Sequence, residues 1–239
     1  MSADNGLFGE LYLRTTRPFL PDHVTRADAD YLSARLAELP LPGPVLDVGC
    51  GHGRHLNALK TSRFTVGLDF DALSLSEVKT PAVRADFFDL PFRDGAFAAA
   101  YAWYNTLFTV DDERHAPLLQ GLARCVRAGG LLILQGTNGE WARAQGTTLT
   151  RVPLADGSRL TEHVHFNAER GRDEIDRRLE LPDGRVMAAS FFIRYYAVEA
   201  LKRLLDDAGF TTMWVHGTLE GQPATVRSPD LIVGAVKRG

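Results

Sequence analysis

The chain has 239 residues, of which 45% are hydrophobic and 24% charged, and its formal net charge is −3. These values are typical of one globular domain, and the slight negative charge provides no basic surface for the phosphate backbone of a nucleic acid. The two cysteines, Cys50 and Cys125, form neither a CxxC motif nor a disulfide framework, which favours a reducing compartment. Without a membrane-length apolar run or a signal peptide, we expect a cytoplasmic protein with no membrane partner.

The first half of the chain alternates between strand and helix patterns. Residues 1–21 are rich in aromatics and proline but lack periodicity, whereas residues 27–39 place apolar side chains at helical spacing. Short apolar strands are then expected at 45–48, 64–69, 83–85, 96–102 and 131–135, and helices at 54–60, 72–78 and 111–128, the last ended by Gly129 and Gly130. This alternation predicts a parallel sheet with helices on both faces.

The pattern changes at about residue 147. Four strand-like segments follow, separated by turn signals at Gly157, Gly171 and Gly184, which predicts an antiparallel meander. Residues 197–210 return to a helical pattern, and two strands close the chain. We therefore expect a single α/β domain over 1–239. Its elaborations are an N-terminal segment and helix at 1–40 and an antiparallel β insert at 147–195.

The segment "VLDVGCGHGR" (45–54) carries the densest pattern. A strand that contains Asp47 leads into Gly49, Gly51 and Gly53 at alternate positions, and a helix follows. Glycines at such a turn adopt positive φ and let a ligand approach the backbone closely. A dinucleotide-binding turn would read GxGxxG, but Arg54 stands where the third glycine belongs, so the fit to a dinucleotide is poor.

The pattern Asp-x-Gly-x-Gly-x-Gly resembles motif I of class I S-adenosylmethionine-dependent methyltransferases. "RADFFDLPF" (84–92) resembles the family's segment after strand three. "CVRAGGLLIL" (125–134) resembles the segment before strand five, with alanine in place of the usual proline. The resemblance covers about residues 40–138 and 195–238. It implies a Rossmann-like seven-stranded sheet whose last strand is inserted antiparallel, with S-adenosylmethionine as cofactor.

The resemblance also implies where the cofactor lies. A carboxylate at Asp69, at the end of the second strand, can accept hydrogen bonds from both ribose hydroxyls, and Asp86 would contact the adenine amino group. By analogy, the N-terminal segment would fold over the cofactor as a lid. The expected cofactor-binding residues are Tyr12, Arg14, Asp47, Gly49, Cys50, Gly51, Gly53, Asp69, Phe70, Asp86, Phe87 and Tyr101.

The acceptor is less clearly marked. "AYAWYNTLF" (100–108) occupies the position of the [N/D/S]PP[Y/F/W] motif of adenine, cytosine-N4 and glutamine methyltransferases but lacks its prolines. Together with the negative charge, this favours a small-molecule acceptor over a nucleic acid. No general base can be named from the sequence. The acceptor-pocket candidates are Tyr101, Trp103, Asn105, His163, His165, Arg194 and Tyr196.

His163 and His165 lie two residues apart in an expected strand and therefore share one face. Without a third ligand nearby, we expect them to line a pocket or face solvent rather than bind a metal. Two alternatives to a methyltransferase stay open, an NAD(P)-dependent oxidoreductase and a non-catalytic cofactor-binding scaffold. The sequence is compatible with a monomer or a homodimer.

Overall fold

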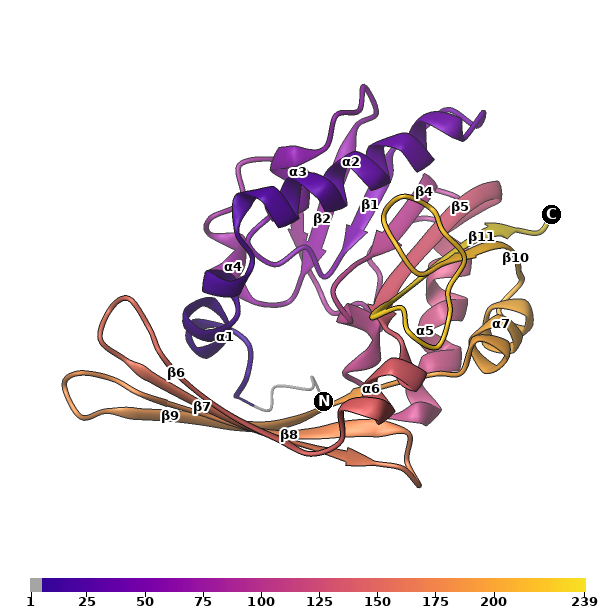
Figure 1. Ribbon diagram of the computed structural model, residues 1–239. Coiled ribbons are helices and arrows are strands. Elements are labelled where there is room, and N and C mark those ends of the chain that lie inside the picture. Colours follow the sequence, from indigo (N-terminus) through magenta and orange to yellow (C-terminus); the bar gives the residue numbers. More distant parts are fainter. Residues whose placement is uncertain (1–5) are drawn as a thin grey trace.

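The computed structural model describes residues 6–239, which form two sheets with helices around them (Figure 1). The larger sheet has the strand order β10-β11-β5-β4-β1-β2-β3. Its strands are β1 (Val45–Val48), β2 (Thr65–Asp69), β3 (Ala82–Arg84), β4 (Phe97–Ala102), β5 (Val126–Thr137), β10 (Phe210–His216) and β11 (Asp230–Lys237). β11 is antiparallel to both β5 and β10, whereas the pairs from β3 to β5 are parallel. The predicted Rossmann-like seven-stranded sheet is confirmed.

Helices cover both faces of the larger sheet. The helices of the described residues are α1 (Glu10–Thr15), α2 (Asp22–Glu38), α3 (Arg54–Ala58), α4 (Ala72–Leu75), α5 (Asp112–Cys125), α6 (Gly139–Gln145) and α7 (Val198–Asp207), with 3-10 turns η1 (Arg17–Phe19) and η2 (Thr106–Phe108). On one face Leu32 of α2 lies in a buried cluster with Ile133 of β5. On the other, Leu122 of α5 and Leu205 of α7 lie in a cluster with Leu132. Because successive side chains of β5 point to opposite faces of the sheet, Ile133 and Leu132 pack into the two different cores.

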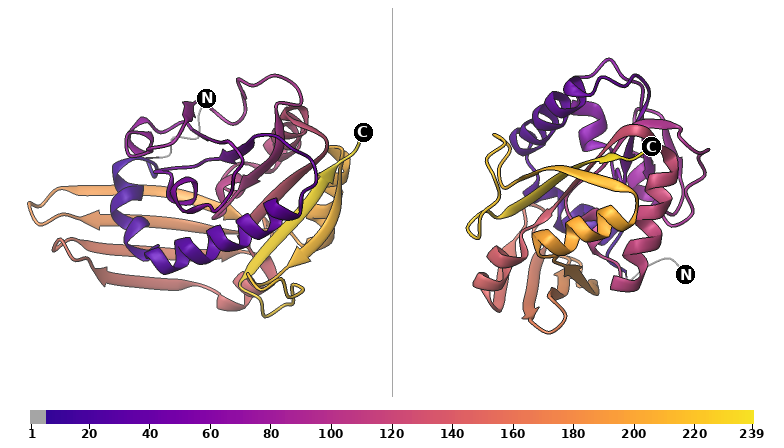
Figure 2. Two further views of the ribbon diagram at one scale, coloured as in Figure 1. Left: turned by 90° about the horizontal axis from the view of Figure 1, so that it is seen from above. Right: turned by 90° about the vertical axis from the view of Figure 1, so that its right-hand side faces the viewer.

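The second sheet is an antiparallel meander in the order β6-β7-β8-β9. Its strands are β6 (Thr148–Pro153), β7 (Arg159–Asn167), β8 (Arg172–Glu180) and β9 (Val186–Arg194). In Figure 1 this sheet lies below the larger one, and seen from above its strands extend past α1 (Figure 2). Leu11 of α1 packs with Leu160 and Leu179 on its inner face. The second sheet therefore has its own small core, which includes α1.

Three local expectations need correction. The N-terminal segment contains α1, a six-residue helix too short to show a periodic pattern. The helix expected to reach residue 128 ends at Cys125, and Gly129 and Gly130 lie inside β5. A Cβ at Gly130 would come within 2.7 Å of the Ala98 carbonyl oxygen, so close strand approach explains this glycine. Helix α6 has no counterpart in the sequence reading, and residues 1–5 of the expected 1–40 segment lie outside the described residues.

Within residues 6–239, no helix has both the length and the apolar character needed to cross a bilayer.

We expect Leu122→Ala to lower the free energy of unfolding by about 2–5 kcal/mol, because the truncation leaves a cavity between α5 and the larger sheet. Leu122 is fully buried in that core. Denaturant titration measures the change. The control Met213→Ala, at a side chain that is 60% exposed, should cost less than about 0.5 kcal/mol. Equal losses in the two variants would contradict this description of the core.

Candidate active site

The glycine loop after β1 is held open by its backbone. Gly49, Gly51 and Gly53 have φ values of +69°, +55° and +76°, which residues with a side chain rarely adopt. A Cβ at Gly49 would come within 2.2 Å of Thr106 Cγ2, whereas a Cβ at Gly51 would meet nothing within 4 Å. Space for a ligand therefore opens directly over Gly51.

Asp69 joins this loop to the end of β2. Its Oδ2 accepts a hydrogen bond from the Gly51 amide at 2.7 Å, and its Oδ1 accepts one from the Asp71 amide at 2.9 Å. Burial raises the pKa of Asp69, and the two amides oppose that shift. The carboxylate keeps further lone pairs toward the cavity that it lines.

The turn after β4 forms a neighbouring wall. Tyr104 and Asn105 adopt left-handed backbone angles, with φ of +61° and +59°. The turn is fixed from β5, since the Tyr104 amide donates to Gln135 Oε1 at 2.6 Å and the Thr137 amide donates to Asn105 Oδ1 at 2.7 Å. Such a strained pair is typical of functional sites, and both residues line the cavity.

One cavity of about 670 Å³ connects these features. Its walls are the glycine loop, the end of β2, the segment after β3, the turn after β4, α1 and the inner face of the second sheet. Some of the expected site residues line it, namely Tyr12, Gly49, Gly51, Asp69, Phe70, Asp86, Phe87 and Asn105. The others lie elsewhere, namely Arg14, Asp47, Cys50, Gly53, Tyr101, Trp103, His163, His165, Arg194 and Tyr196.

Several of these others lie beneath the cavity. Asp47, Cys50, Tyr101 and Trp103 are all buried in the protein interior. Burial raises the pKa of Asp47 to about 7 and raises that of the Cys50 thiol as well. Tyr101 is the neighbour of Asp47, and in the described part of the chain neither its hydroxyl nor Asp47 Oδ2 makes a hydrogen bond of normal geometry. A Cβ at Gly53 would contact the side chain of Val78, so no open space lies over this glycine. These residues shape the loop from below and do not line the ligand space.

The two histidines face away from the cavity. Their neighbours Glu162 and Val164 line it, so alternation along β7 places His163 and His165 on the outer, exposed face. The prediction that they share a face holds, but the expectation that they line the pocket is wrong. The more apolar set on β7 marks the covered face, and that signal was present in the sequence.

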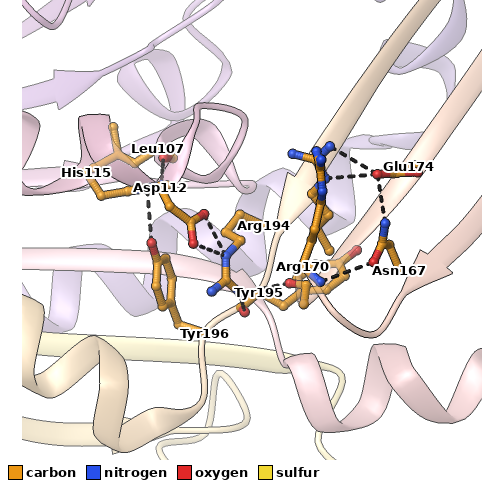
Figure 3. A network of polar contacts seen from close by, with 11 residues as sticks. Leu107, Asp112, His115, Asn167, Arg170, Glu174, Arg194, Tyr195 and Tyr196 are labelled. Atoms are coloured by element: carbon orange, nitrogen blue, oxygen red, sulfur yellow. Dashed lines mark hydrogen bonds and ion pairs between the residues drawn. The ribbon is translucent and has the colours of Figure 1, made fainter.

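Arg194 and Tyr196 fasten the second sheet to α5 (Figure 3). Arg194 Nε donates to Asp112 Oδ1 at 2.8 Å, and its guanidinium also binds the carbonyl of Tyr195. The Tyr196 hydroxyl lies 3.1 Å from His115 Nδ1. Both side chains are engaged at this junction and neither lines the cavity, so the prediction that they belong to the acceptor pocket is wrong.

Of the two N-terminal residues expected to bind the cofactor, one lines the cavity and the other does not. Tyr12 lines the cavity, and burial raises its pKa to about 12. Arg14 instead pairs with Glu10 at 2.8 Å and Asp156 at 3.1 Å on the surface. Its ion pair with Asp156, in the turn between β6 and β7, attaches α1 to the second sheet.

Sequence reasoning missed three charged residues on the inner face of the second sheet. Glu162, Asp173 and Arg177 all line the cavity. Arg177 Nε donates to Glu162 Oε2 at 2.6 Å, and Arg177 Nη1 donates to the hydroxyls of Thr15 and Thr16 at 3.1 and 2.8 Å. Their neighbours in the sequence carry many charges, so no composition signal distinguished them.

Comparison with known proteins identifies the family. A model of a methyltransferase domain matches residues 45–130. The cypemycin N-terminal methyltransferase of a Streptomyces species is 31% identical over 207 residues, covering 81% of this chain and 83% of that protein. This chain is a class I S-adenosylmethionine-dependent methyltransferase. The predicted family and cofactor are thereby confirmed.

Two further similarities concern the fold and the domain. The sugar N-methyltransferase KedS8 of a Streptoalloteichus species has the same fold, with a TM-score of 0.70 at 21% identity over 97% of this chain and 94% of that one. A shorter match is 33% identical over 102 residues. It covers 41% of this chain and 16% of a tRNA (carboxymethyluridine(34)-5-O)-methyltransferase of Xenopus tropicalis.

The cavity of this methyltransferase fits its cofactor in shape and charge. The open space over Gly51 gives backbone access, and Asp69, Asp71 and Asp86 line the same side. These carboxylates attract a sulfonium cation and would repel a pyrophosphate. The similarity to methyltransferases, and not the cavity charge alone, shows that the NAD(P)-dependent oxidoreductase and the non-catalytic scaffold were wrong alternatives. In the chain from Gly6 onward, no three His, Cys, Asp or Glu side chains converge as a metal site would require.

We expect Gly51→Ala to weaken S-adenosylhomocysteine binding by about tenfold or more, because the added Cβ enters the open space over the loop. Gly184→Ala is a matched control, since Gly184 also has positive φ and open space but lies in the turn between β8 and β9. Each substitution costs about 1–2 kcal/mol in backbone strain. Isothermal titration measures the affinity. Equal affinities in the two variants would show that the loop does not contact the cofactor.

The buried carboxyl of Asp47 predicts a pH dependence of stability. Its pKa is about 7 in the folded protein and has an ordinary value of 3.8. Between these values the folded state binds more protons, so this group's contribution to the free energy of unfolding falls as pH rises. We expect Asp47→Asn to gain stability relative to wild type up to about pH 7, with a constant difference above. Denaturant titration across pH measures this, and a difference independent of pH would refute it.

Proposed function

We propose that the acceptor is a small organic molecule, bound between the turn after β4 and the inner face of the second sheet. The observation that carries this is the cavity that extends from the glycine loop to Val164, Ile175 and Phe191. Its volume of about 670 Å³ falls in the usual range of pockets for small ligands. Helix α1, bound to the second sheet through Arg177, forms another wall of this space.

Similarity to other proteins supports the proposal without deciding it. KedS8 is named as a sugar N-methyltransferase, which is a small-molecule activity, whereas the Xenopus relative is named for a tRNA. Arg177 is the single basic side chain among the described lining residues, and it is bound to Glu162. An RNA acceptor would require basic groups for its phosphates. The charge of the cavity therefore favours the small molecule.

We also infer the residues that hold the cofactor. Asp69 would accept the ribose hydroxyls with its remaining lone pairs, and the backbone at Gly49 and Gly51 would receive the methionine part. Asp86, with its neighbour Phe87, would contact the adenine. Asp86 Oδ1 already accepts a hydrogen bond from the Phe88 amide at 3.0 Å, which fixes that carboxylate in place.

The reaction then needs little covalent chemistry from the protein. Methyl transfer from a sulfonium is an in-line displacement, so the chain contributes by aligning the acceptor and excluding water. Tyr12 and Tyr104 line the cavity, and aromatic faces stabilise a nearby cation.

The direct test uses S-adenosylmethionine labelled in its methyl group. An extract of the source cells is separated into small-molecule, RNA and protein fractions, and each is incubated with the enzyme. We expect the label in the small-molecule fraction. Label found only in RNA or protein would overturn the proposed acceptor class.

Narrowing the acceptor half of the cavity should separate acceptor binding from cofactor binding. We expect Val164→Phe to lower methyl transfer to small molecules at least about tenfold while S-adenosylhomocysteine affinity stays unchanged, because the larger ring fills space away from the glycine loop. His163→Phe is the matched control on the outer face of the same strand. Loss of activity in both variants, or loss of cofactor affinity in Val164→Phe, would place the acceptor elsewhere.

A further inference from the structure

The charged residues on the inner face of the second sheet differ in whether they have a partner of opposite charge. Arg177 and Glu162 pair across β7 and β8, with 2.6 Å between Nε and Oε2, and Arg177 also binds Thr15 and Thr16. Glu162 neutralises the charge of Arg177, and the hydrogen bonds to Glu162, Thr15 and Thr16 occupy the Nε and Nη1 donors of Arg177. The pair therefore holds the wall together and leaves little for an acceptor.

Asp173, on the same face of the sheet, differs from this pair. It lies on β8 opposite Phe166 of β7 and Ile193 of β9, two residues from Ile175, so its surroundings in the sheet are apolar. Its Oδ2 accepts a hydrogen bond from the Tyr195 hydroxyl at 2.7 Å, and it forms no ion pair within the described part of the chain. Burial raises the pKa of Asp173, while the Tyr195 hydrogen bond and His165 on the outer face lower it.

The opposite wall of the cavity also contains an acidic residue. Asp230, at the start of β11, accepts a hydrogen bond from Gln135 Nε2 at 2.7 Å, and burial raises its pKa. No lysine occurs among the described residues that line the cavity, and Arg177 is already paired. Asp173 and Asp230 thus face this part of the cavity without a cationic partner in the described part of the chain, and either carboxylate would attract a positively charged group.

We propose that the acceptor carries an amine, and that Asp173, oriented by Tyr195, binds this amine as an ammonium group and accepts its proton. The inference rests on the proposed small-molecule function and names the acceptor's chemical class. A carboxylate or phosphate at this position would face uncompensated negative charge, and a neutral hydroxyl would leave the aspartate without its ion pair.

The ammonium group transfers one proton to Asp173, which leaves a neutral nitrogen with a lone pair. That lone pair forms the new N–C bond to the methyl carbon as the C–S bond breaks, and the electron pair of that bond stays on sulfur. The product is an N-methylammonium group, which keeps the positive charge in the same carboxylate-lined space, and the proton on Asp173 passes to solvent.

The test uses benzylamine, phenethylamine and tyramine, each with its matched alcohol and carboxylic acid, titrated into the enzyme with S-adenosylhomocysteine present. We expect the amines to bind more tightly than the alcohols and acids. Asp173→Asn should weaken amine binding by about tenfold to a hundredfold and leave the alcohols and S-adenosylhomocysteine unchanged. Asp176→Asn is the matched control, since Asp176 lies on the outer face of β8 and binds Ser190.

Tyr195→Phe keeps the test valid if Asp173→Asn does not fold, because it removes only the hydroxyl that orients Asp173. We expect it to reduce the preference for amines over alcohols, with the affinity for alcohols unchanged. The inference is overturned if amines bind no better than alcohols, including the case of no amine binding, or if the preference survives in Asp173→Asn. Labelled methyl groups found on small-molecule oxygen atoms alone would overturn it and leave the proposed function intact. Label on macromolecules alone would defeat the proposed function itself.

Discussion

The hydrogen bond from the Gly51 amide to Asp69 is the contact on which the site depends. It joins the loop after β1 to the end of β2, at the edge where parallel strands present their carboxyl ends. The positive φ values of the loop glycines keep its backbone free of side chains, and Thr106 fills the space beside Gly49. The same carboxylate therefore supports the loop and remains available to a ligand.

Below the loop, a second constraint follows from burial. Asp47 is an acid in an interior of aromatic and aliphatic side chains, with Tyr101 as its neighbour. Its raised pKa reflects the cost of charge without solvent, which the positive charge of Arg54 partly offsets. A buried acid of this kind reduces the stability of the apoprotein, and such local costs are typical of functional sites.

The second sheet is held to the rest of the protein by contacts at two different places. Arg194 binds Asp112 of α5, and Arg177 binds Thr15 and Thr16 next to the end of α1 (Figure 3 shows the first). Together they fix an open antiparallel sheet over the carboxyl edge of the larger one. Of these two arginines only Arg177 lines the cavity, and its pairing with Glu162 leaves the remaining charge toward the cavity negative.

The sequence by itself determined the order of strands and helices, the glycine loop, the antiparallel final strand and the residues at the strand ends, such as Asp69 and Asp86. The strands, the helices and the glycine loop follow from local backbone preferences and periodicity, which are properties of neighbouring residues. The antiparallel final strand and the roles expected of Asp69 and Asp86 follow instead from the resemblance to class I methyltransferases. Only the tertiary structure decided what packs against the inner face of β7, and therefore that Glu162 lines the cavity. It also decided that Arg194 is engaged by Asp112 and that Asp173 is left without a cation. A period of two shows which side chains share a face, but the partner that covers that face comes from a distant part of the chain.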